Sequence, residues 1–176
     1  METGPDGRRI LVVGCGGAGK TTFARSLAEK LALPMIHLDR HYWRAGWGMP
    51  TLDDWRAEVA ELSAGSEWIM DGNYANSYDI RMPRADTLIW LDYPRTTCLR
   101  RVILRTLKDY GRSRPDLPEG CPEHFDLAFL RYVWDFPVKS RPRIAEGIDR
   151  HGRHLRVAQL RHGREIAAYL DGAGRA

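Results

Sequence analysis

The chain of 176 residues lacks the features that mark membrane, secreted and disulfide-rich proteins. No apolar run approaches the roughly 20 residues that a membrane-spanning helix needs. Residues 1–7 are polar and acidic, whereas a secretion signal is basic and then apolar. The three cysteines are far apart and odd in number, which favours free thiols in a reducing compartment. We therefore expect a cytoplasmic protein with no membrane partner.

Motifs of the common nucleic-acid-binding and GTPase classes are also missing. The sequence has no zinc finger, no basic heptad region, no recognisable helix-turn-helix and no Asn-Lys-x-Asp segment that would read guanine. Cys121 and His124 are two ligands without a partner pair, too few for a four-coordinate structural zinc. A nucleic-acid partner is therefore possible but has no motif to support it, and a small-molecule partner is expected. The chain is expected to be a monomer or a homodimer.

Lysine is scarce relative to arginine in a chain of net charge +4. A genome whose base composition favours arginine codons is one explanation. Repeated bidentate binding of phosphate is the other, because the planar guanidinium suits that task better than an ammonium group. The two explanations are compatible, and a basic pI alone does not identify a nucleic-acid binder.

The most informative segment that is present is a phosphate loop at residues 14–21. An apolar run over residues 10–13 leads into G-x-x-x-x-G-K-T, and apolar residues at helical spacing follow. Small residues let backbone N–H groups surround phosphates, while the helix start adds a favourable dipole. Lysine supplies charge to the outer phosphates and threonine an oxygen for Mg²⁺. The segment predicts binding of a nucleoside triphosphate by Gly14, Gly16, Gly17, Ala18, Gly19, Lys20, Thr21 and Thr22.

Strands and helices alternate along the chain, which predicts an α/β fold with a parallel sheet. The expected strands cover residues 8–13, 34–38, 67–70, 87–91 and 155–158. The expected helices cover residues 19–31, a segment capped by Thr51, and residues 95–110, 123–136, 138–150 and 163–170. Residues 1–176 are expected to form one domain with a core of its own.

Three aspartates stand directly after expected strands, at the sheet edge where binding residues collect. Asp71 is at a position suited to the Mg²⁺ shell. Asp39, backed by His37 and His41, is a candidate catalytic base for an acceptor hydroxyl. Asp92, close to a proline, is better explained as a turn former.

The aromatic loop at residues 41–48 stands beside Asp39 and contains Tyr42, Trp43 and Trp47. Its rings could form a flat wall for a base or a sugar. They could equally pack the domain surface, and the sequence leaves both interpretations open.

A basic helix and a Gly/Pro-rich segment predict a closing lid over residues 111–136. Arg101 and Arg105 share one helical face, and Arg114 follows in the lid. Such cations could stabilise a transferring phosphoryl group, so these three join Lys20 and Asp39 as candidate catalytic residues. Arg131, Arg141 and Arg143 could extend the cluster.

Taken together, these motifs resemble the adenylate-kinase-like P-loop kinases. The similarity extends further to the bacterial group named DNA topology modulation proteins, through His37-Leu38-Asp39, Asp71-Gly72-Asn73-Tyr74, Asp79-Ile80-Arg81 and Arg114-Pro115-Asp116. The resemblance implies strand order 2-3-1-4-5 in a three-layer sandwich, ATP with Mg²⁺, and Arg101 and Arg105 as lid-hinge arginines. Adenylate kinases follow Asp-Gly with Phe-Pro-Arg, so Arg81 would have to hold an acceptor phosphate here.

The sequence thus predicts a kinase that moves the γ-phosphate of ATP to a nucleoside, nucleotide or other small hydroxylated acceptor. The alternative is an ATP-binding regulatory or DNA-associated switch without small-molecule kinase activity.

Overall fold

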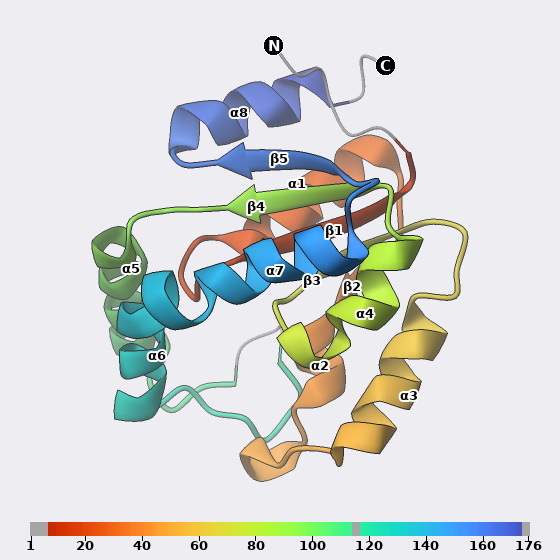
Figure 1. The fold of residues 1–176 in the computed structure, drawn as a ribbon. Coiled ribbons are helices and arrows are strands. Elements are labelled where there is room, and N and C mark those ends of the chain that lie inside the picture. The colour runs from red at the N-terminus through yellow and green to blue at the C-terminus, as the bar shows by residue number, and fades with distance from the viewer. Residues whose placement is uncertain (1–6, 114–116, 174–176) are drawn as a thin grey trace.

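A parallel five-stranded sheet forms the centre of the molecule (Figure 1). The structure is a computed structural model and describes residues 7–113 and 117–173. The strands are β1 (Arg9–Gly14), β2 (Met35–His37), β3 (Trp68–Asp71), β4 (Thr87–Leu91) and β5 (Arg156–Leu160). Their order is β2-β3-β1-β4-β5 with every neighbouring pair parallel, which confirms the predicted fold class and topology.

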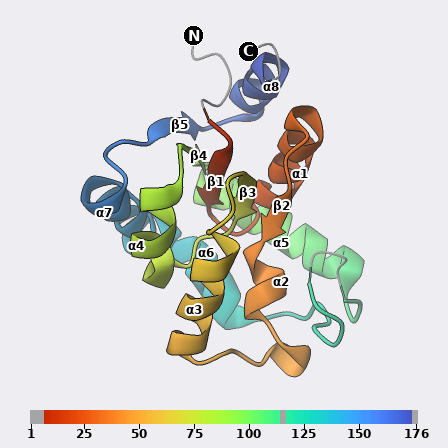
Figure 2. The ribbon, with the colours of Figure 1, turned by 90° about the vertical axis from the view of Figure 1, so that its right-hand side faces the viewer.

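Helices cover both faces of this sheet. The longer helices are α1 (Lys20–Leu31), α3 (Leu52–Leu62), α5 (Arg95–Asp109), α6 (Leu127–Lys139), α7 (Arg141–His151) and α8 (Gly163–Gly172). Two short helices are α2 (Leu38–Tyr42) and α4 (Tyr78–Arg81). Figure 2 shows α1 and α8 on one side of the sheet and α4 and α7 on the other. This arrangement is the three-layer sandwich that the sequence predicts.

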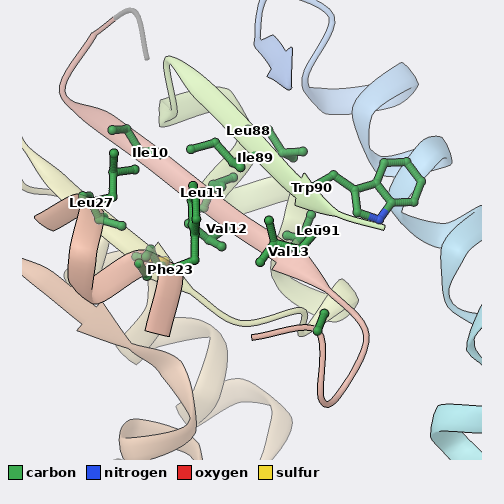
Figure 3. Packing of buried hydrophobic residues seen from close by; sticks show 14 of the residues in the cluster. Ile10, Leu11, Val12, Val13, Phe23, Leu27, Leu88, Ile89, Trp90 and Leu91 are labelled. Carbon is green, nitrogen blue, oxygen red and sulfur yellow. The ribbon is translucent and has the colours of Figure 1, made fainter. Parts of the chain in front are cut away.

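The central strand is apolar on both sides because both sides are covered. Residues 10–13 of β1 are fully buried, as are Leu88 and Ile89 of β4. Phe23 and Leu27 of α1 pack toward β1 (Figure 3). A strand buried on both faces reads as a continuous apolar run rather than an alternating one. The run that precedes the phosphate loop is therefore a buried central strand.

Two predicted boundaries near the site are wrong. β2 ends at His37, and α2 begins at once, so Asp39 lies in the first turn of a helix rather than at a strand end. The helix predicted from residue 123 begins at Leu127, because Asp126 caps it by accepting hydrogen bonds from the backbone N–H groups of Ala128 and Phe129. Phe125 therefore precedes the helix and is 48% exposed, while Val133 and Phe136 are the buried positions.

The three cysteines are free, as predicted, and all three are buried. Within residues 7–113 and 117–173, no helix combines the length and the apolarity that crossing a membrane requires. The predicted domain extent, residues 1–176, stays a prediction.

Candidate active site

The phosphate loop connects β1 to α1 through residues whose backbone is left-handed. Gly14, Gly17 and Gly19 have φ of 149°, 81° and 91°. No side chain caps α1 and no acidic residue stands in its first turn, so its first N–H groups have no side-chain acceptor. Lys20 Nζ donates to the carbonyl oxygen of Cys15 at 3.1 Å, which folds the lysine back over the loop. The loop is thus shaped to receive an anion.

Gly17 is the position where this loop packs closest to α5. A Cβ built there would lie 2.4 Å from the carbonyl oxygen of Cys98 and 2.9 Å from Val102. Gly19 has a similar φ, but a Cβ there meets nothing within 4 Å. Both positions share the backbone strain of a positive φ, but only Gly17 has a steric conflict with α5.

We expect Gly17→Ala to lower the free energy of unfolding by about 1–3 kcal/mol more than Gly19→Ala does, because only Gly17→Ala overpacks the α5 contact. Urea unfolding followed by circular dichroism measures both variants. Equal losses in the two variants would contradict the packing described for Gly17.

Arg101 reaches this loop from α5. Its Nη1 lies 3.5 Å from the carbonyl oxygens of Gly17 and Ala18, and its guanidinium stacks over the Tyr93 ring at 4.4 Å. Arg101 therefore lies beside the phosphate loop, and its catalytic role stays a prediction.

Thr21 and Asp71 meet beside the phosphate loop. Thr21 Oγ1 donates to Asp71 Oδ2 at 2.8 Å, and His37 Nδ1 lies 2.8 Å from the same oxygen. The pairing is set by the register, in which His37 stands opposite Asp71 in the sheet. Asp71 is fully buried, and its Oδ1 has no hydrogen-bond partner among the described residues. A buried carboxylate oxygen next to a threonine hydroxyl suits a hard cation.

The described residues contain no group of three or more histidine, cysteine or acidic side chains that could hold a metal ion. Mg²⁺ does not need such a group, because it takes few protein ligands and completes its shell with water and phosphate oxygens.

Asp39 points its carboxylate toward the same region from α2. Its Oδ1 accepts a hydrogen bond from the Tyr74 hydroxyl at 2.6 Å, and its Oδ2 lies 3.9 Å from His37 Nε2. Burial, together with the Asp39 charge, raises the pKa of Tyr74, so this hydroxyl stays protonated and donates. His41, predicted to back Asp39, contacts Glu58 instead, with Nδ1 3.0 Å from Oε1. Tyr74 fulfils the role expected of His41.

Asn73 links three parts of the site. The Gly14 N–H donates to Asn73 Oδ1 at 3.0 Å, and Asn73 Nδ2 donates to the Gly14 carbonyl at 2.8 Å and to the Tyr132 hydroxyl at 3.0 Å. Asn73 follows β3, Gly14 ends β1 and Tyr132 belongs to α6. One amide therefore joins the start of the phosphate loop to a helix of the predicted lid.

The loop that carries Asn73 and Tyr74 is held from beneath by Arg81. This side chain is fully buried and donates to the carbonyl oxygens of Gly72 (3.2 Å), Asn73 and Tyr74 (3.2 Å). Burial lowers the pKa of Arg81 to about 10, which leaves it charged at neutral pH. The expectation that Arg81 holds an acceptor phosphate is therefore wrong, because its donors are consumed by the backbone inside the protein.

The lid cations differ in their surroundings. Arg105 Nε lies 3.4 Å from Glu123 Oε1, and Glu123 also accepts from Thr106 Oγ1 at 3.2 Å, which ties α5 to the segment before α6. Arg114 lies outside the described residues, so its role stays a prediction. Arg131, 81% exposed, contacts Asp135.

Arg141 binds Asp92 at 2.8 Å, and Asp92 also accepts from Gln159 at 2.6 Å. Asp92 is thus structural, as predicted. Arg131 and Arg141 do not line the cavity described next, which corrects their proposed part in the cluster.

A single cavity of about 1010 Å³ joins these groups. Its lining includes Gly16, Gly17, Gly19, Lys20, Thr21, Thr22, His37, Asp39, Asp71, Asn73, Tyr74, Arg101 and Arg105. Trp43 and Trp47 of the aromatic loop line it as well. Tyr42 packs on Trp55 and Tyr74, with ring centroids 5.0 and 4.6 Å apart. Tyr42 therefore packs against neighbouring aromatic residues, whereas a base- or sugar-binding role for Trp43 and Trp47 stays a prediction.

The architecture is similar to that of solved kinase structures. A shikimate kinase from Acinetobacter baumannii, in complex with shikimate, superposes with a TM-score of 0.57 at 17% identity, covering 93% of this chain and 89% of that one. A gluconokinase from Sinorhizobium meliloti gives 0.52 at 17% identity, covering 97% and 89%. The chain has the P-loop kinase fold. At such identities the similarity to these P-loop kinases concerns the fold alone.

One curated relative is similar in sequence. A Pyrococcus furiosus protein described as "Putative adenylate kinase" is 30% identical over 118 residues, which is 63% of this chain. The chain spans 60% of the length of that relative. No family model matches the chain.

Sequence reasoning missed the roles of Asn73, Tyr74 and Tyr132. The only signal available was the position of Asn73 and Tyr74 directly after Asp71-Gly72, where a loop between a strand end and a helix enters the site. Tyr132 gave no signal, because its partner lies 59 residues away in the sequence.

Proposed function

We propose that this protein is an ATP-dependent kinase that transfers the γ-phosphate to a hydroxyl group of a small acceptor. The observation that carries the proposal is that one cavity contains both the phosphate loop and the Asp39 carboxylate. Thr21, Asp71 and His37 lie between them. Phosphate transfer between two bound molecules requires a phosphate-binding group and a proton-accepting group within one cavity.

In this proposal the phosphate loop and Lys20 hold the outer phosphates of ATP, and Arg101 adds charge where the loop meets α5. Thr21 and Asp71 are suited to hold Mg²⁺, which supplies charge neutralisation to the phosphate oxygens. The orphaned Oδ1 of Asp71 supports this assignment. Arg105 and Arg114 are proposed to approach the transferred group from the lid.

Asp39 accepts the proton of the acceptor hydroxyl as its oxygen attacks phosphorus. The oxygen–phosphorus bond forms, the bond between the γ-phosphorus and the bridging oxygen breaks, and ADP leaves with the electron pair. Asp39 then returns its proton to solvent. Tyr74 holds the carboxylate in place through its donated hydrogen bond.

Incubation with Mg-ATP and a panel of nucleosides, nucleotides and hydroxylated metabolites tests the proposal. We expect ADP formation that depends on one class of acceptor. Bound ATP with no acceptor-dependent turnover across the panel would instead favour a nucleotide-dependent switch. Salt-sensitive DNA binding that responds to ATP would identify the DNA-associated form of that switch.

Tyr132→Phe tests the link between α6 and the phosphate loop. The variant removes the oxygen that accepts from Asn73, and one hydrogen bond contributes about 0.5–1.5 kcal/mol, so ATP affinity should fall about two- to tenfold. Calorimetric titration measures the affinity. Tyr110→Phe is the control, since that ring is 62% exposed. Unchanged affinity in Tyr132→Phe would mean that the link does not order the loop.

A further inference from the structure

A continuous wall runs from Asp39 away from the phosphate loop. The Trp43 N–H donates to the Asp39 carbonyl at 3.1 Å, so Trp43 stands one helical turn beyond Asp39. The Trp43 ring meets the Trp47 ring at 5.3 Å, and Trp47 meets the ring of His124 at 5.7 Å. With Tyr74, these residues all line the cavity, and we call Asp39, Trp43, Trp47, Tyr74 and His124 the acceptor wall.

The far end of the wall is built from two segments that fix each other. The Gly46 N–H donates to the Gly120 carbonyl at 2.8 Å, and Cys121 Sγ donates to the Arg44 carbonyl at 3.2 Å. A Cβ added at Gly120 would lie 3.1 Å from that of Ala45. The aromatic loop and the segment before α6 therefore close this end of the cavity together.

Within the described residues, the acceptor wall contains a carboxylate and no lysine or arginine. The nearby arginines are engaged elsewhere. Arg44 binds Glu58 and the His41 carbonyl, Arg56 binds Asp79, and Arg81 binds the backbone of residues 72–74.

The described cations that do line the cavity are Lys20, Arg25, Arg101 and Arg105. Lys20 and Arg101 contact the phosphate loop, and Arg105 contacts Glu123. Arg25 lies on α1, one turn beyond Thr21. Lys20 and Arg101 thus place positive charge at the phosphate loop, whereas the acceptor wall itself is acidic and aromatic.

We propose that the acceptor is an uncharged, hydroxylated molecule with a flat ring, of the nucleoside type, and not a phosphorylated or carboxylated compound; this rests on the proposed function. A hydroxyl binds Asp39, while the ring packs on Trp43 and Trp47. A phosphate or carboxylate on the acceptor faces the Asp39 charge and loses hydration without gaining a lysine or arginine partner in the acceptor wall.

Matched pairs of probes test this inference directly. Each common nucleoside is compared with its 5′-monophosphate, and shikimate and gluconate serve as carboxylated probes. Binding is followed by tryptophan fluorescence in the presence of Mg-ADP, and transfer by labelled γ-phosphate. We expect at least one nucleoside to bind at least tenfold more tightly than its monophosphate. Trp43→Ala should weaken the binding of that nucleoside at least tenfold and leave the affinity for Mg-ADP unchanged.

Trp134→Ala is the matched control, because this tryptophan is 44% exposed on α6 and lies outside the cavity. Asp39→Asn should reduce the discrimination against the monophosphate. Tighter binding of a monophosphate or a carboxylate than of the neutral probes overturns the inference. If Arg25→Gln then abolishes that binding, Arg25 is the anion ligand. Absence of nucleoside binding overturns the inference as well.

The two proposals fail in different ways. Nucleoside binding without phosphate transfer contradicts the proposed kinase function and leaves the acceptor class standing. Phosphate transfer to a monophosphate contradicts the acceptor class alone.

Discussion

Asp39→Asn is expected to lower the rate of phosphate transfer by about 10²- to 10⁴-fold, the usual contribution of a general base. The amide keeps the shape of the side chain and can still accept from Tyr74, but it cannot take the proton of the acceptor hydroxyl. The affinity for ATP should stay within about twofold, because Asp39 contacts Tyr74 and His37 rather than the phosphate loop. Single-turnover kinetics and calorimetric titration of ATP measure the two quantities.

Asp53→Asn is the control for this variant, since Asp53 is an exposed residue of α3. A loss of ATP affinity in Asp39→Asn, in place of a loss of transfer rate, would assign Asp39 to the metal site.

Lys20→Ala is expected to lower kcat/KM for ATP by about 10²- to 10³-fold, the scale of removing one charged group from a transition state. The residue is partly exposed, and its described hydrogen bond is the one to the Cys15 carbonyl. The free energy of unfolding should therefore change by less than about 1.5 kcal/mol. Steady-state kinetics and urea unfolding check both expectations.

Lys30→Ala, on the exposed last turn of the same helix, should change neither quantity appreciably. An equal kinetic loss in both lysine variants would point to general electrostatics rather than to a phosphate contact by Lys20.

The fold could be predicted from the sequence because its signals are local. The apolar run of β1, the glycine spacing after it and the amphipathic α1 stand within about one βα unit, and each follows from backbone chemistry alone. Asp39 and Asp71 could be predicted as site residues because each stands near the end of a strand, and parallel strands end at one edge of the sheet.

The connections between these residues could not be predicted in the same way. Tyr74, in the loop after β3, contacts Asp39 in α2, and Asn73 contacts Gly14 and Tyr132 across 59 residues in each direction. Arg81 has the sequence context of a phosphate ligand, and only its full burial shows that it supports the backbone. Such pairings depend on tertiary packing, which residue type and spacing do not encode.

The identity of the products tests the central claim most directly. Wild-type protein and Asp39→Asn are incubated with Mg-ATP and the acceptor panel, and the products are identified by mass spectrometry. The account predicts an acceptor that gains one phosphoryl group in step with ADP formation by the wild type, and strong loss of that product in Asp39→Asn. Release of inorganic phosphate with ADP and no phosphorylated acceptor, or equal product from both proteins, would contradict it.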